Sequence, residues 1–263
     1  MPKIRAAVCH EFGKPLVLEE VMLREPAAGE LEVTIRACAI CHSDISAMDG
    51  DWGGHLPAVY GHEAAGVITG IGADVSTYKI GDTVLVTLIR SCGHCVSCCS
   101  GKPTCCETRY DTVSGPLKTI DGKPMEQGLA TGAFAEKVVV DQSQIQHIPE
   151  NISMASASLL ACGVITGIGA VTNTAKVTVG STVAVIGAGG VGLNAIQGSV
   201  ISGASKIIAI DVTEEKLKVA KEFGATDVVL TSDDKPHRIV KKMTGGRGVD
   251  YVFVTVGSIP AYE

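Results

Sequence analysis

The sequence lacks the basic clusters that are typical of a nucleic-acid-binding protein. Its formal net charge is −6, and lysines and arginines are scattered along the 263 residues, with Lys241-Lys242 as the longest basic run. Nucleic acids and anionic membranes attract proteins through clustered positive charge. We therefore expect no nucleic acid and no membrane as a partner.

Long apolar runs and a secretory leader are also missing. No stretch approaches the ~20 apolar residues that a membrane span requires. The start, MPKIRAAVCHEFG, has no apolar region of the kind found in signal peptides. We therefore expect a cytoplasmic, reducing location, where clustered cysteines indicate a metal site or catalysis more often than disulfides.

Cysteine, by contrast, is abundant, and six of the ten cysteines lie in the segment 91–106, SCGHCVSCCSGKPTCC. Polar residues, Gly and Pro surround them, so this segment has too few apolar groups to pack a core. The spacing C-x2-C-x2-C-x7-C allows four thiolates to meet at one tetrahedral ion, as in a structural zinc site. The predicted ligands are Cys92, Cys95, Cys98 and Cys106.

Alternatives remain open within this cluster. Cys99 can replace Cys98 as a ligand, and Cys105 can replace Cys106. His94 lies between two ligands and can also bind a metal, although four thiolates already fill a tetrahedral site. A local disulfide knot is disfavoured, because cysteines three residues apart are crowded for disulfide geometry.

The two parts of the chain have different patterns, and together they predict an α/β protein. Up to about residue 150, short strand-like segments alternate with Gly and Pro turns, which predicts a barrel-like β domain. A stretch rich in small residues (153–178) suits a helix. Beyond it, strand-like and helix-like segments alternate, which predicts a parallel, doubly wound sheet. We expect one domain at 1–165 and a second at 166–263.

The expected elements can be placed by their residue patterns. Helices are expected from about Gly190, from Thr213 to Phe223, and again between the strands at 227–230 and 249–257. Thr213 is the expected N-cap of the second helix, and Gly224 ends it. The expected strands are 31–40, 66–72, 82–88 and 134–140 in the first part, and 181–187, 206–211, 227–230 and 249–257 in the second.

A glycine-rich turn opens the second part. The segment 187–192, GAGGVG, satisfies G-x-G-x-x-G between a predicted strand and a predicted helix, and Asp211 ends the next strand. This is the dinucleotide-binding fingerprint, in which the helix N-terminus holds a pyrophosphate. A carboxylate at Asp211 can bind the ribose hydroxyls and would repel a 2′-phosphate, which favours NAD over NADP. The predicted cofactor-binding residues of the turn are Gly187, Gly189, Gly190, Val191 and Gly192.

Cys41, His62 and Cys162 are candidates for a second metal site. Two cysteines and one histidine leave a fourth zinc position open, and this is the ligand set of alcohol dehydrogenases. The chain resembles the zinc-dependent medium-chain alcohol dehydrogenases, on motifs that span nearly its whole length. The matching motifs are Cys41-x-Ser43-Asp44, Gly61-His62-Glu63, the cysteines at 92–106, Cys162-Gly163, and the 187–192 turn with Asp211.

The resemblance implies a fold and a set of cofactors. It implies a GroES-like, zinc-binding catalytic domain at 1–165 and an NAD-binding Rossmann domain at 166–263. Two zinc ions per chain follow, one catalytic and one structural, with NAD as the hydride acceptor. In the full-length form, the family forms homodimers or homotetramers.

Roles at the catalytic zinc are implied at matching positions only. Cys41, His62 and Cys162 would hold the ion, with Glu63 close by as an outer or transient ligand. Asp44 would orient His62 through its other ring nitrogen, as carboxylates commonly do for metal-bound histidines.

Further roles concern the proton and the cofactor. Ser43 would take the proton from the alcohol, His42 would reach the cofactor pyrophosphate, and Thr166 would lie near the nicotinamide. Lys216 would lie near the adenosine ribose, although a solvated lysine explains it equally well. Many family members relay the proton through a histidine where this chain has Ser46.

The resemblance also implies the reaction. It is the NAD-linked oxidation of a primary alcohol, aromatic or allylic, to the aldehyde by hydride transfer, and the reverse. Trp52 and Leu88 match pocket-lining positions, although both also suit simple packing, and the loop 106–134 is long enough to cover a pocket. The alternatives are an S-(hydroxymethyl)thiol dehydrogenase and a non-catalytic zinc- and nucleotide-binding relic.

A shortened second domain is expected as well. A full dinucleotide-binding fold has six strands, and only four can be read before the end of this sequence. We therefore expect an incomplete Rossmann domain in a C-terminally truncated family member, with little or no activity at this length.

Overall fold

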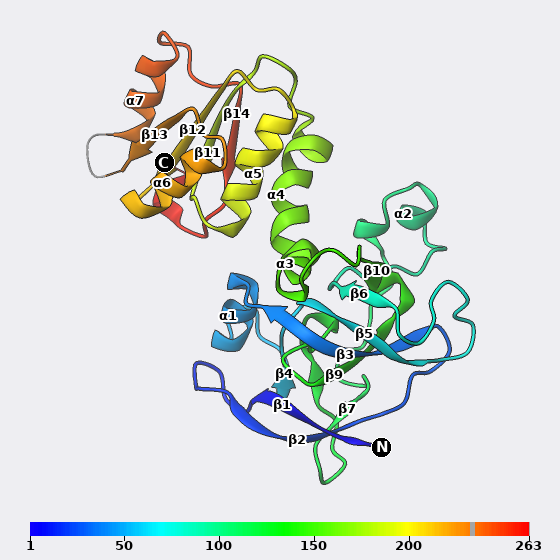
Figure 1. The fold of residues 1–263 in the computed structure, drawn as a ribbon. Helices are drawn as coiled ribbons and strands as arrows, with labels where there is room; N and C mark the ends of the chain where they lie inside the picture. The colour runs from blue at the N-terminus through cyan, green and yellow to red at the C-terminus, as the bar shows by residue number, and fades with distance from the viewer. Residues whose placement is uncertain (232–234, 263) are drawn as a thin grey trace. The chain divides into compact units, whose positions relative to one another are not determined.

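The computed structural model describes residues 1–231 and 235–262 and divides the chain into two units, Met1–Cys162 and Gly163–Glu263. The first is built from short strands with few helices, and the second alternates strand and helix (Figure 1). The expected α/β class, with a GroES-like barrel-like part followed by a Rossmann-like sheet, is confirmed.

Two five-stranded sheets form the first unit. One has the order β7-β2-β1-β4-β8, and the other has the order β10-β6-β5-β3-β9. The first sheet consists of β1 (Lys3–Cys9), β2 (Val17–Leu23), β4 (Ala58–Val59), β7 (Leu117–Lys118) and β8 (Glu126–Gln127). The second consists of β3 (Glu30–Ala39), β5 (Glu63–Ile71), β6 (Thr83–Val86), β9 (Lys137–Asp141) and β10 (Ile145–His147).

Alternation along these strands builds the core of the first unit. In β1, Ile4, Ala6 and Val8 are buried, whereas Lys3 and Arg5 between them are exposed. Side chains of a strand point to opposite faces in turn, so one face of β1 is apolar and packs inward. The loop 106–134 contributes β7 and β8 to the edges of the first sheet, so these parts of the loop belong to the barrel.

The helices of the first unit are short. They are α1 (His42–Asp49), α2 (Val96–Cys99) and α3 (Met154–Leu159), with 3-10 turns η1 (Pro103–Cys105), η2 (Gly128–Ala130) and η3 (Gln142–Gln144). Helix α1 ends at Gly50, whose φ of 85° is the left-handed conformation that glycine adopts without strain.

The second unit is a parallel sheet of order β13-β12-β11-β14 with helices on both faces. Its elements are α4 (Ile165–Gly169), η5 (Ala170–Ala175), β11 (Thr182–Ile186), α5 (Gly190–Ile201), β12 (Lys206–Asp211), α6 (Glu214–Glu222), β13 (Asp227–Leu230), α7 (Pro236–Met243), β14 (Tyr251–Val254) and η6 (Ile259–Ala261). The four strands and three helices predicted for residues 181–257 are therefore confirmed.

Successive side chains of β11 again point to opposite faces of the sheet, so they belong to two separate hydrophobic clusters. Val183 and Val185 of β11 face the cluster that contains Ile196 of α5 and Leu217 of α6. The intervening Ala184 packs with Val240 of α7 on the other face.

The start of helix α6 differs from the prediction in one detail. Thr213 occupies the N-cap position, but its side chain makes no capping hydrogen bond among the residues that the structure describes. Instead, the backbone N–H of Thr213 donates to Asp211 Oδ1 at 3.0 Å. The Asp211 carboxylate therefore fixes the backbone of the N-cap residue itself, which differs from the predicted capping by the threonine hydroxyl.

One helical segment overturns an expectation from the sequence. Residues Met154–Ala175, which comprise α3, a π-helix (η4, Leu160–Val164), α4 and η5, form 22 helical residues of mean hydropathy 1.8. By length and composition alone this helix can cross a membrane, so the expectation that no stretch is long and apolar enough was wrong. Its parts have packing partners, however: α3 packs on β3 and β5, and α4 packs on α5.

Candidate metal centres and nucleotide-binding turn

Four residues from three parts of the first unit converge on one point. The ligand atoms of Cys41, His62, Glu63 and Cys162 all lie within 4.8 Å of one another. Cys41 precedes helix α1, His62 and Glu63 stand at the start of β5, and Cys162 lies in the π-helix. The structure therefore brings together three segments that the sequence separates widely.

The carboxylate of Asp44 holds this group in place. Its Oδ1 lies 2.9 Å from Nδ1 of His62 and accepts the N–H of Gly61 at 3.0 Å, and its Oδ2 accepts the N–H of Cys41 at 3.1 Å. Asp44 and His62 have no exposed surface. The predicted contact between Asp44 and His62 is confirmed, and Nδ1 is occupied so that Nε2 is the ring nitrogen left for another partner.

His62 Nε2 is a buried atom with no hydrogen-bond partner among the residues that the structure describes. Leaving a buried polar atom unpaired costs roughly 1–3 kcal/mol, so such an atom indicates a missing partner. Nε2 belongs to the same cluster as the sulfurs of Cys41 and Cys162. Two sulfurs and one imidazole nitrogen are a zinc donor set, so the residues present fit a zinc ion.

The charges at this site favour ionised groups. The neighbouring Cys162 and His62 lower the pKa of the Cys41 thiol to about 3. Burial by itself would lower the pKa of His62, but its contacts with Asp44 and Cys41 outweigh burial and raise that pKa to about 9. A thiolate is the form that binds metals, and the imidazole must lose its proton to do so.

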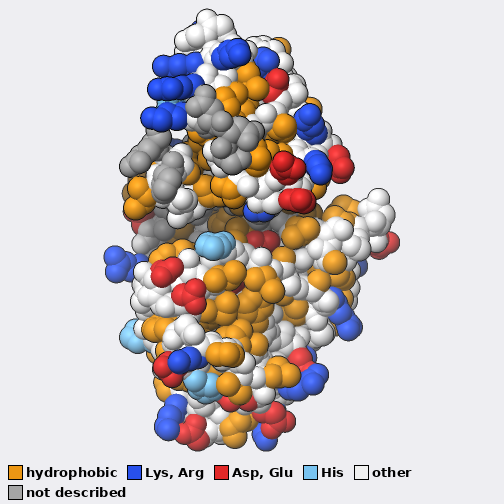
Figure 2. Space-filling model, turned by 90° about the vertical axis from the view of Figure 1, so that its left-hand side faces the viewer, with side chains coloured by type: hydrophobic (Ala, Val, Ile, Leu, Met, Phe, Trp, Pro, Cys, Tyr) orange, Lys and Arg blue, Asp and Glu red, His pale blue; other side chains and the backbone are white. Residues whose placement is uncertain are grey.

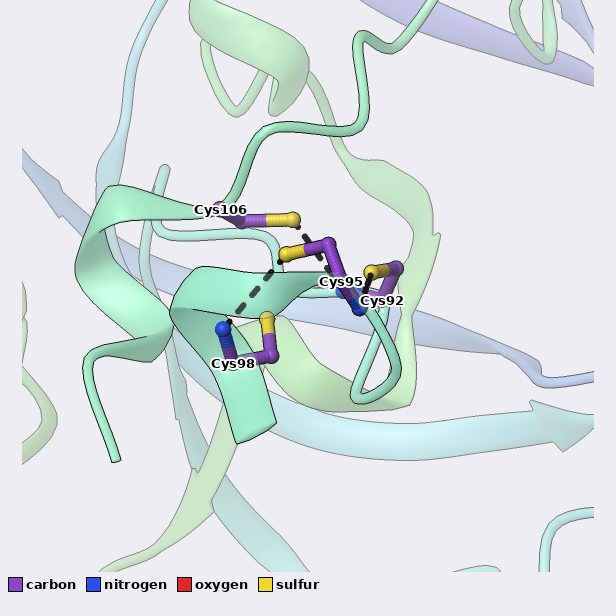
Figure 3. Close-up of side chains that lie close together, drawn as sticks. All are labelled: Cys92, Cys95, Cys98 and Cys106. Carbon is purple, nitrogen blue, oxygen red and sulfur yellow. Dashed lines mark hydrogen bonds between the residues drawn. The ribbon is translucent and has the colours of Figure 1, made fainter. Parts of the chain in front are cut away.

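The second candidate centre is the cysteine-rich lobe between β6 and β7. The sulfurs of Cys92, Cys95, Cys98 and Cys106 lie within 4.8 Å of one another (Figure 3). Cys99 is exposed next to Cys98. The structure thus groups the ligand set first predicted, and neither Cys99 nor the exposed Cys105 belongs to it.

Backbone N–H groups point at the sulfurs of the lobe. The N–H of Cys95 donates to Cys92 Sγ at 3.3 Å, that of Cys98 to Cys95 Sγ at 3.4 Å, and that of Cys92 to Cys106 Sγ at 3.3 Å (Figure 3). Such donors stabilise thiolates, and hydrogen bonds led by Thr108 lower the pKa of Cys92 to about 5. Desolvation and the neighbouring Cys95 raise the pKa of Cys98 to about 12. The raised pKa of Cys98 reflects in part the repulsion that four thiolates this close together would experience without a cation among them.

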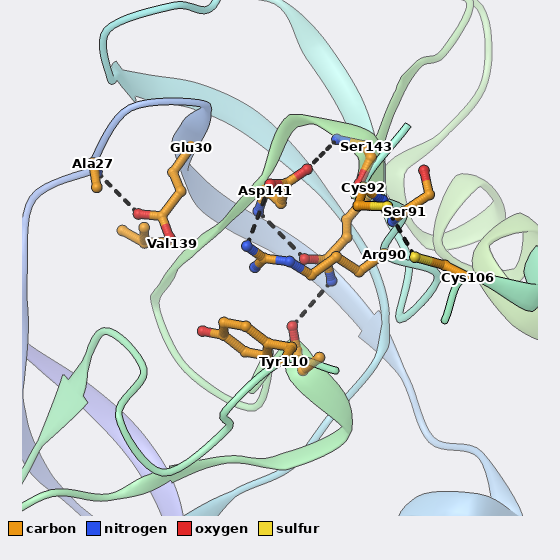
Figure 4. A network of polar contacts seen from close by, with 12 residues as sticks. Ala27, Glu30, Arg90, Ser91, Cys92, Cys106, Tyr110, Val139, Asp141 and Ser143 are labelled. Carbon is orange, nitrogen blue, oxygen red and sulfur yellow. Dashed lines mark hydrogen bonds and ion pairs between the residues drawn. The ribbon is translucent and has the colours of Figure 1, made fainter. Parts of the chain in front are cut away.

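A polar network attaches this lobe to the barrel (Figure 4). The guanidinium of Arg90 lies 3.3 Å from Asp141 Oδ2 and 4.1 Å from the ring centre of Tyr110. The N–H of Ser91 donates to Ser143 Oγ at 3.0 Å. The residue before the first lobe cysteine is therefore fixed to the barrel. A pocket of about 590 Å³ lies between the lobe and these residues.

In the second unit, the glycine turn joins β11 to α5. Gly187 has a φ of 94°, and a Cβ on Gly192 would lie 1.8 Å from the Gly187 carbonyl oxygen, so both positions require glycine. Apart from the adjoining backbone, no atom of the described residues would lie within 4 Å of a Cβ on Gly189 or Gly190. These two glycines therefore leave open space beside the start of α5, where an approaching pyrophosphate can reach the backbone.

Asp211 and an unpredicted residue, Thr255, complete the turn. The Asp211 carboxylate accepts the N–H of Ala188 at 2.7 Å. Thr255 follows β14, and its hydroxyl donates to the Gly187 carbonyl at 2.8 Å. One feature of the sequence points to Thr255. It lies near the end of a predicted strand, and in a parallel sheet that end lies at the same edge as the end of β11.

A pocket of about 700 Å³ in the second unit is lined by Gly187, Asp211 and Lys216 among others. Lys216 therefore lies near the predicted nucleotide site. Val191 is the second residue of α5, and Thr166 is exposed on α4.

The other predicted residues of the first unit lie near or on its surface. His42 is exposed and Ser43 is half-buried at the start of α1. Trp52 and Leu88 are 60% and 36% exposed, so neither is an internal packing residue.

Family models and solved structures match the chain closely. Residues 27–150 match the alcohol dehydrogenase GroES-like domain, and residues 190–263 match the zinc-binding dehydrogenase model. An alcohol dehydrogenase zinc-binding domain protein from Burkholderia ambifaria is 32% identical, with a TM-score of 0.93 over 99% of this chain and 72% of that one. The chain belongs to the zinc-type medium-chain alcohol dehydrogenase family.

Two further family members are similar. Benzyl alcohol dehydrogenase from Acinetobacter calcoaceticus is 32% identical, with a TM-score of 0.91 over 100% of this chain and 73% of that one. An NAD-dependent alcohol dehydrogenase is 29% identical, with a TM-score of 0.81 over 94% of this chain and 69% of that one. This medium-chain dehydrogenase is thus an alcohol dehydrogenase-type oxidoreductase whose family binds zinc and a nucleotide cofactor.

Proposed function

We propose that this protein oxidises a primary alcohol, aromatic or allylic, to the aldehyde with NAD and a catalytic zinc, and catalyses the reverse reduction. The observation that carries the proposal is the convergence of Cys41, His62 and Cys162 around a buried Nε2 that has no other partner among the described residues. Glu63 would be an outer or transient ligand of the same ion.

The chain's own residues would perform distinct steps. Cys41, His62 and Cys162 would hold zinc, whose Lewis acidity favours loss of the alcohol proton before the nicotinamide takes the hydride. Ser43 Oγ would accept that proton at the start of α1. Ser46 stands where many family members have a histidine, so proton transfer beyond Ser43 would run through water.

The nucleotide would bind at the glycine turn of the second unit. Gly187, Gly189, Gly190, Val191 and Gly192 would face its pyrophosphate, where the N-terminus of α5 favours an anion. The carboxylate of Asp211, which lines the pocket of the second unit, supports NAD over NADP, since a 2′-phosphate would meet its negative charge. His42 and Thr166 would contact the cofactor.

A second, structural zinc would bind at Cys92, Cys95, Cys98 and Cys106. The grouped sulfurs and the backbone N–H donors aimed at three of them support this assignment. The lobe has few apolar contacts of its own, so the ion would hold it closed.

The protein would act on an aromatic alcohol in the cytoplasm, as a homodimer or homotetramer. The similar benzyl alcohol dehydrogenase and the partly exposed Trp52 and Leu88 support an aromatic alcohol. A cytoplasmic location agrees with ten free cysteines. One face of the first unit carries a broad patch of hydrophobic side chains (Figure 2), which supports association into a homodimer or homotetramer.

The test combines metal content with turnover. The protein at its full natural length should contain two zinc ions per chain. It should form NADH, detected at 340 nm, with benzyl alcohol and NAD in an alcohol panel that is repeated with NADP. Cys162→Ala should contain one zinc and show no turnover. Wild-type rates in Cys162→Ala would refute the three-ligand centre, and a preference for NADP would refute the role given to Asp211.

A further inference from the structure

Thr87 makes a hydrogen bond to the residue before Cys162. Its hydroxyl donates to the Ala161 carbonyl oxygen at 2.8 Å. Ala161 is 1% exposed, so this contact lies inside the first unit. Thr87 directly follows β6, a strand far from the π-helix in sequence. A barrel strand is therefore tied to the backbone that carries Cys162.

Thr87 is itself held rigidly. Its N–H donates to the Gln144 carbonyl at 3.0 Å, and its carbonyl accepts from Gln144 Nε2 at 3.0 Å. Gln144 has no exposed surface, and its Nε2 also donates to the Ala130 carbonyl at 3.0 Å. Both backbone groups of Thr87 are thus held by Gln144, the N–H by its main-chain carbonyl and the C=O by its buried side-chain amide.

The direction of the Cys162 side chain depends on the helical geometry of the segment around it. Residues Leu160–Val164 form a π-helix between two α-helical segments, α3 and α4. A π-turn contains one residue more than an α-turn, and each residue of an α-helix rotates the side chains by about 100°. If this segment relaxed to an α-helix, the Cys162 sulfur would turn away from Cys41 and His62. A donor fixed to the Ala161 carbonyl opposes that change.

We propose that Thr87 is a positioning residue of the catalytic metal centre, which fixes the π-helical register that points Cys162 at the ion. This inference rests on the proposed function, because it requires Cys162 to be a metal ligand. Outer partners of metal ligands typically contribute 10- to 100-fold to metal affinity. Thr87 acts one step further out, through the backbone, and about a 10-fold contribution is expected.

The experiment compares Thr87→Val, which keeps the side-chain shape without the hydroxyl, with Thr87→Ser, which keeps the hydroxyl. Zinc affinity is measured by competition with a chromophoric chelator, and the Co²⁺-substituted proteins are compared by visible absorption. Thr87→Val should bind the Cys41–His62–Cys162 metal about 10-fold more weakly and shift the Co²⁺ bands. Thr87→Ser should stay within about 3-fold of wild type.

Two controls separate this role from general stability. The Cys92–Cys106 zinc is an internal control in each protein and should be unaffected. Thr34→Val removes another threonine hydroxyl contact from the same sheet, the exposed 3.1 Å pair with Thr69, which lies outside the π-helix. It should leave both metal affinities unchanged.

The outcomes distinguish the inference from the function on which it rests. If Cys162→Ser keeps the wild-type affinity for both ions, the proposed centre itself is wrong. If Cys162→Ser loses one ion but Thr87→Val binds both as wild type does, only the role of Thr87 is wrong. A loss that Thr87→Ser shares in full would also contradict that role, because its hydroxyl remains.

Discussion

At the scale of single residues, Asp44 connects three parts of the candidate catalytic centre. Its carboxylate accepts N–H groups from Cys41 and Gly61 and contacts the His62 ring, and it has no exposed surface. Two candidate ligands and the turn between them therefore depend on one buried side chain.

Asp44→Asn should weaken zinc binding at this centre by about 10- to 100-fold. The amide has one acceptor where the carboxylate has two, and its NH2 group cannot accept an N–H. Chelator competition on the purified protein measures the change. Asp49→Asn, at an exposed position of the same helix, is the matched control and should bind zinc as wild type does. Equal affinities in Asp44→Asn and wild type would show that the carboxylate does not orient the ligands.

A second buried carboxylate predicts a pH dependence of folding. Burial by itself would raise the pKa of Glu30, but its hydrogen bonds to Arg24 and to the Ala27 N–H outweigh burial and lower it. A carboxyl with a lowered pKa in the folded state stabilises fully above its unfolded value of about 4.3, and this contribution is lost as the pH falls through the folded value.

Between about pH 5 and pH 3, the free energy of unfolding should therefore fall more steeply in wild type than in Glu30→Gln. Urea denaturation at a series of pH values measures both slopes. Glu20→Gln is the control, since Glu20 forms an exposed pair with Lys3. Parallel curves for wild type and Glu30→Gln would exclude this ion pair as a source of acid lability.

Single residues also show where sequence reasoning stops. The cysteine spacing predicted a four-thiolate centre, but it could not separate Cys98 from Cys99. Adjacent residues of the short helix α2 point about 100° apart, so only the direction of that helix decides which sulfur faces inward. Thr87 carried no signal, because its partner is a backbone carbonyl distant in sequence.

At the scale of elements, the glycines of the 187–192 turn have two different roles: some are needed for the fold, and others leave space for a ligand. Gly192 is needed for packing against the Gly187 carbonyl, whereas Gly189 has open space around it. The structure thus assigns one glycine to the fold and leaves the other for close approach of a ligand.

Gly192→Ala should lower the melting temperature of the protein, because its Cβ would overlap a backbone oxygen. Gly189→Ala should melt as wild type does but bind NAD more weakly, since the methyl group occupies the approach to the turn. Differential scanning fluorimetry and a titration of NAD test both variants. A Gly189→Ala protein with wild-type affinity would place the pyrophosphate elsewhere.

The cysteine lobe allows a similarly paired test. Cys98→Ala should lose the lobe zinc, whereas the neighbouring Cys99→Ala should keep it, because only Cys98 belongs to the sulfur cluster. Zinc per chain, measured by elemental mass spectrometry, should be one and two respectively. The reverse result would exchange the two ligands.

Helices and strands were predicted well where the spacing of apolar residues, or glycines at the ends of a segment, clearly indicates one type of element. The strands and helices of residues 181–257 appear as predicted because apolar strands alternate with helix start and stop signals. The π-helix at Leu160–Val164 could not be predicted, since a single extra residue in a turn leaves no periodic pattern. The two-residue strands β7 and β8 are too short to show alternation.

At the scale of the whole molecule, the metal ligands and the nucleotide turn belong to different units. All eight candidate zinc ligands lie in Met1–Cys162, and the glycine turn lies in Gly163–Glu263. Each unit has hydrophobic clusters of its own. Each ligand should therefore stabilise one unit directly.

Hydrogen exchange followed by mass spectrometry tests this division. Removing zinc with a chelator should speed exchange in 92–106 and around 41–63, while peptides from β11 and β12 keep their protection. Adding NAD should slow exchange around 187–192 and leave the lobe unchanged. Uniform changes across both units on zinc removal would show that the metals support the whole chain.

The placement of Cys162 in the last turn of the first unit also sets an order of events during synthesis. The sulfurs of the lobe lie within one short stretch, so they can capture an ion soon after that stretch leaves the ribosome. Cys41 and His62 emerge earlier still, yet they must wait for the π-helix to be made and to dock. The zinc ion of the lobe would thus bind while the chain is still being synthesised, and the proposed catalytic zinc ion would bind last.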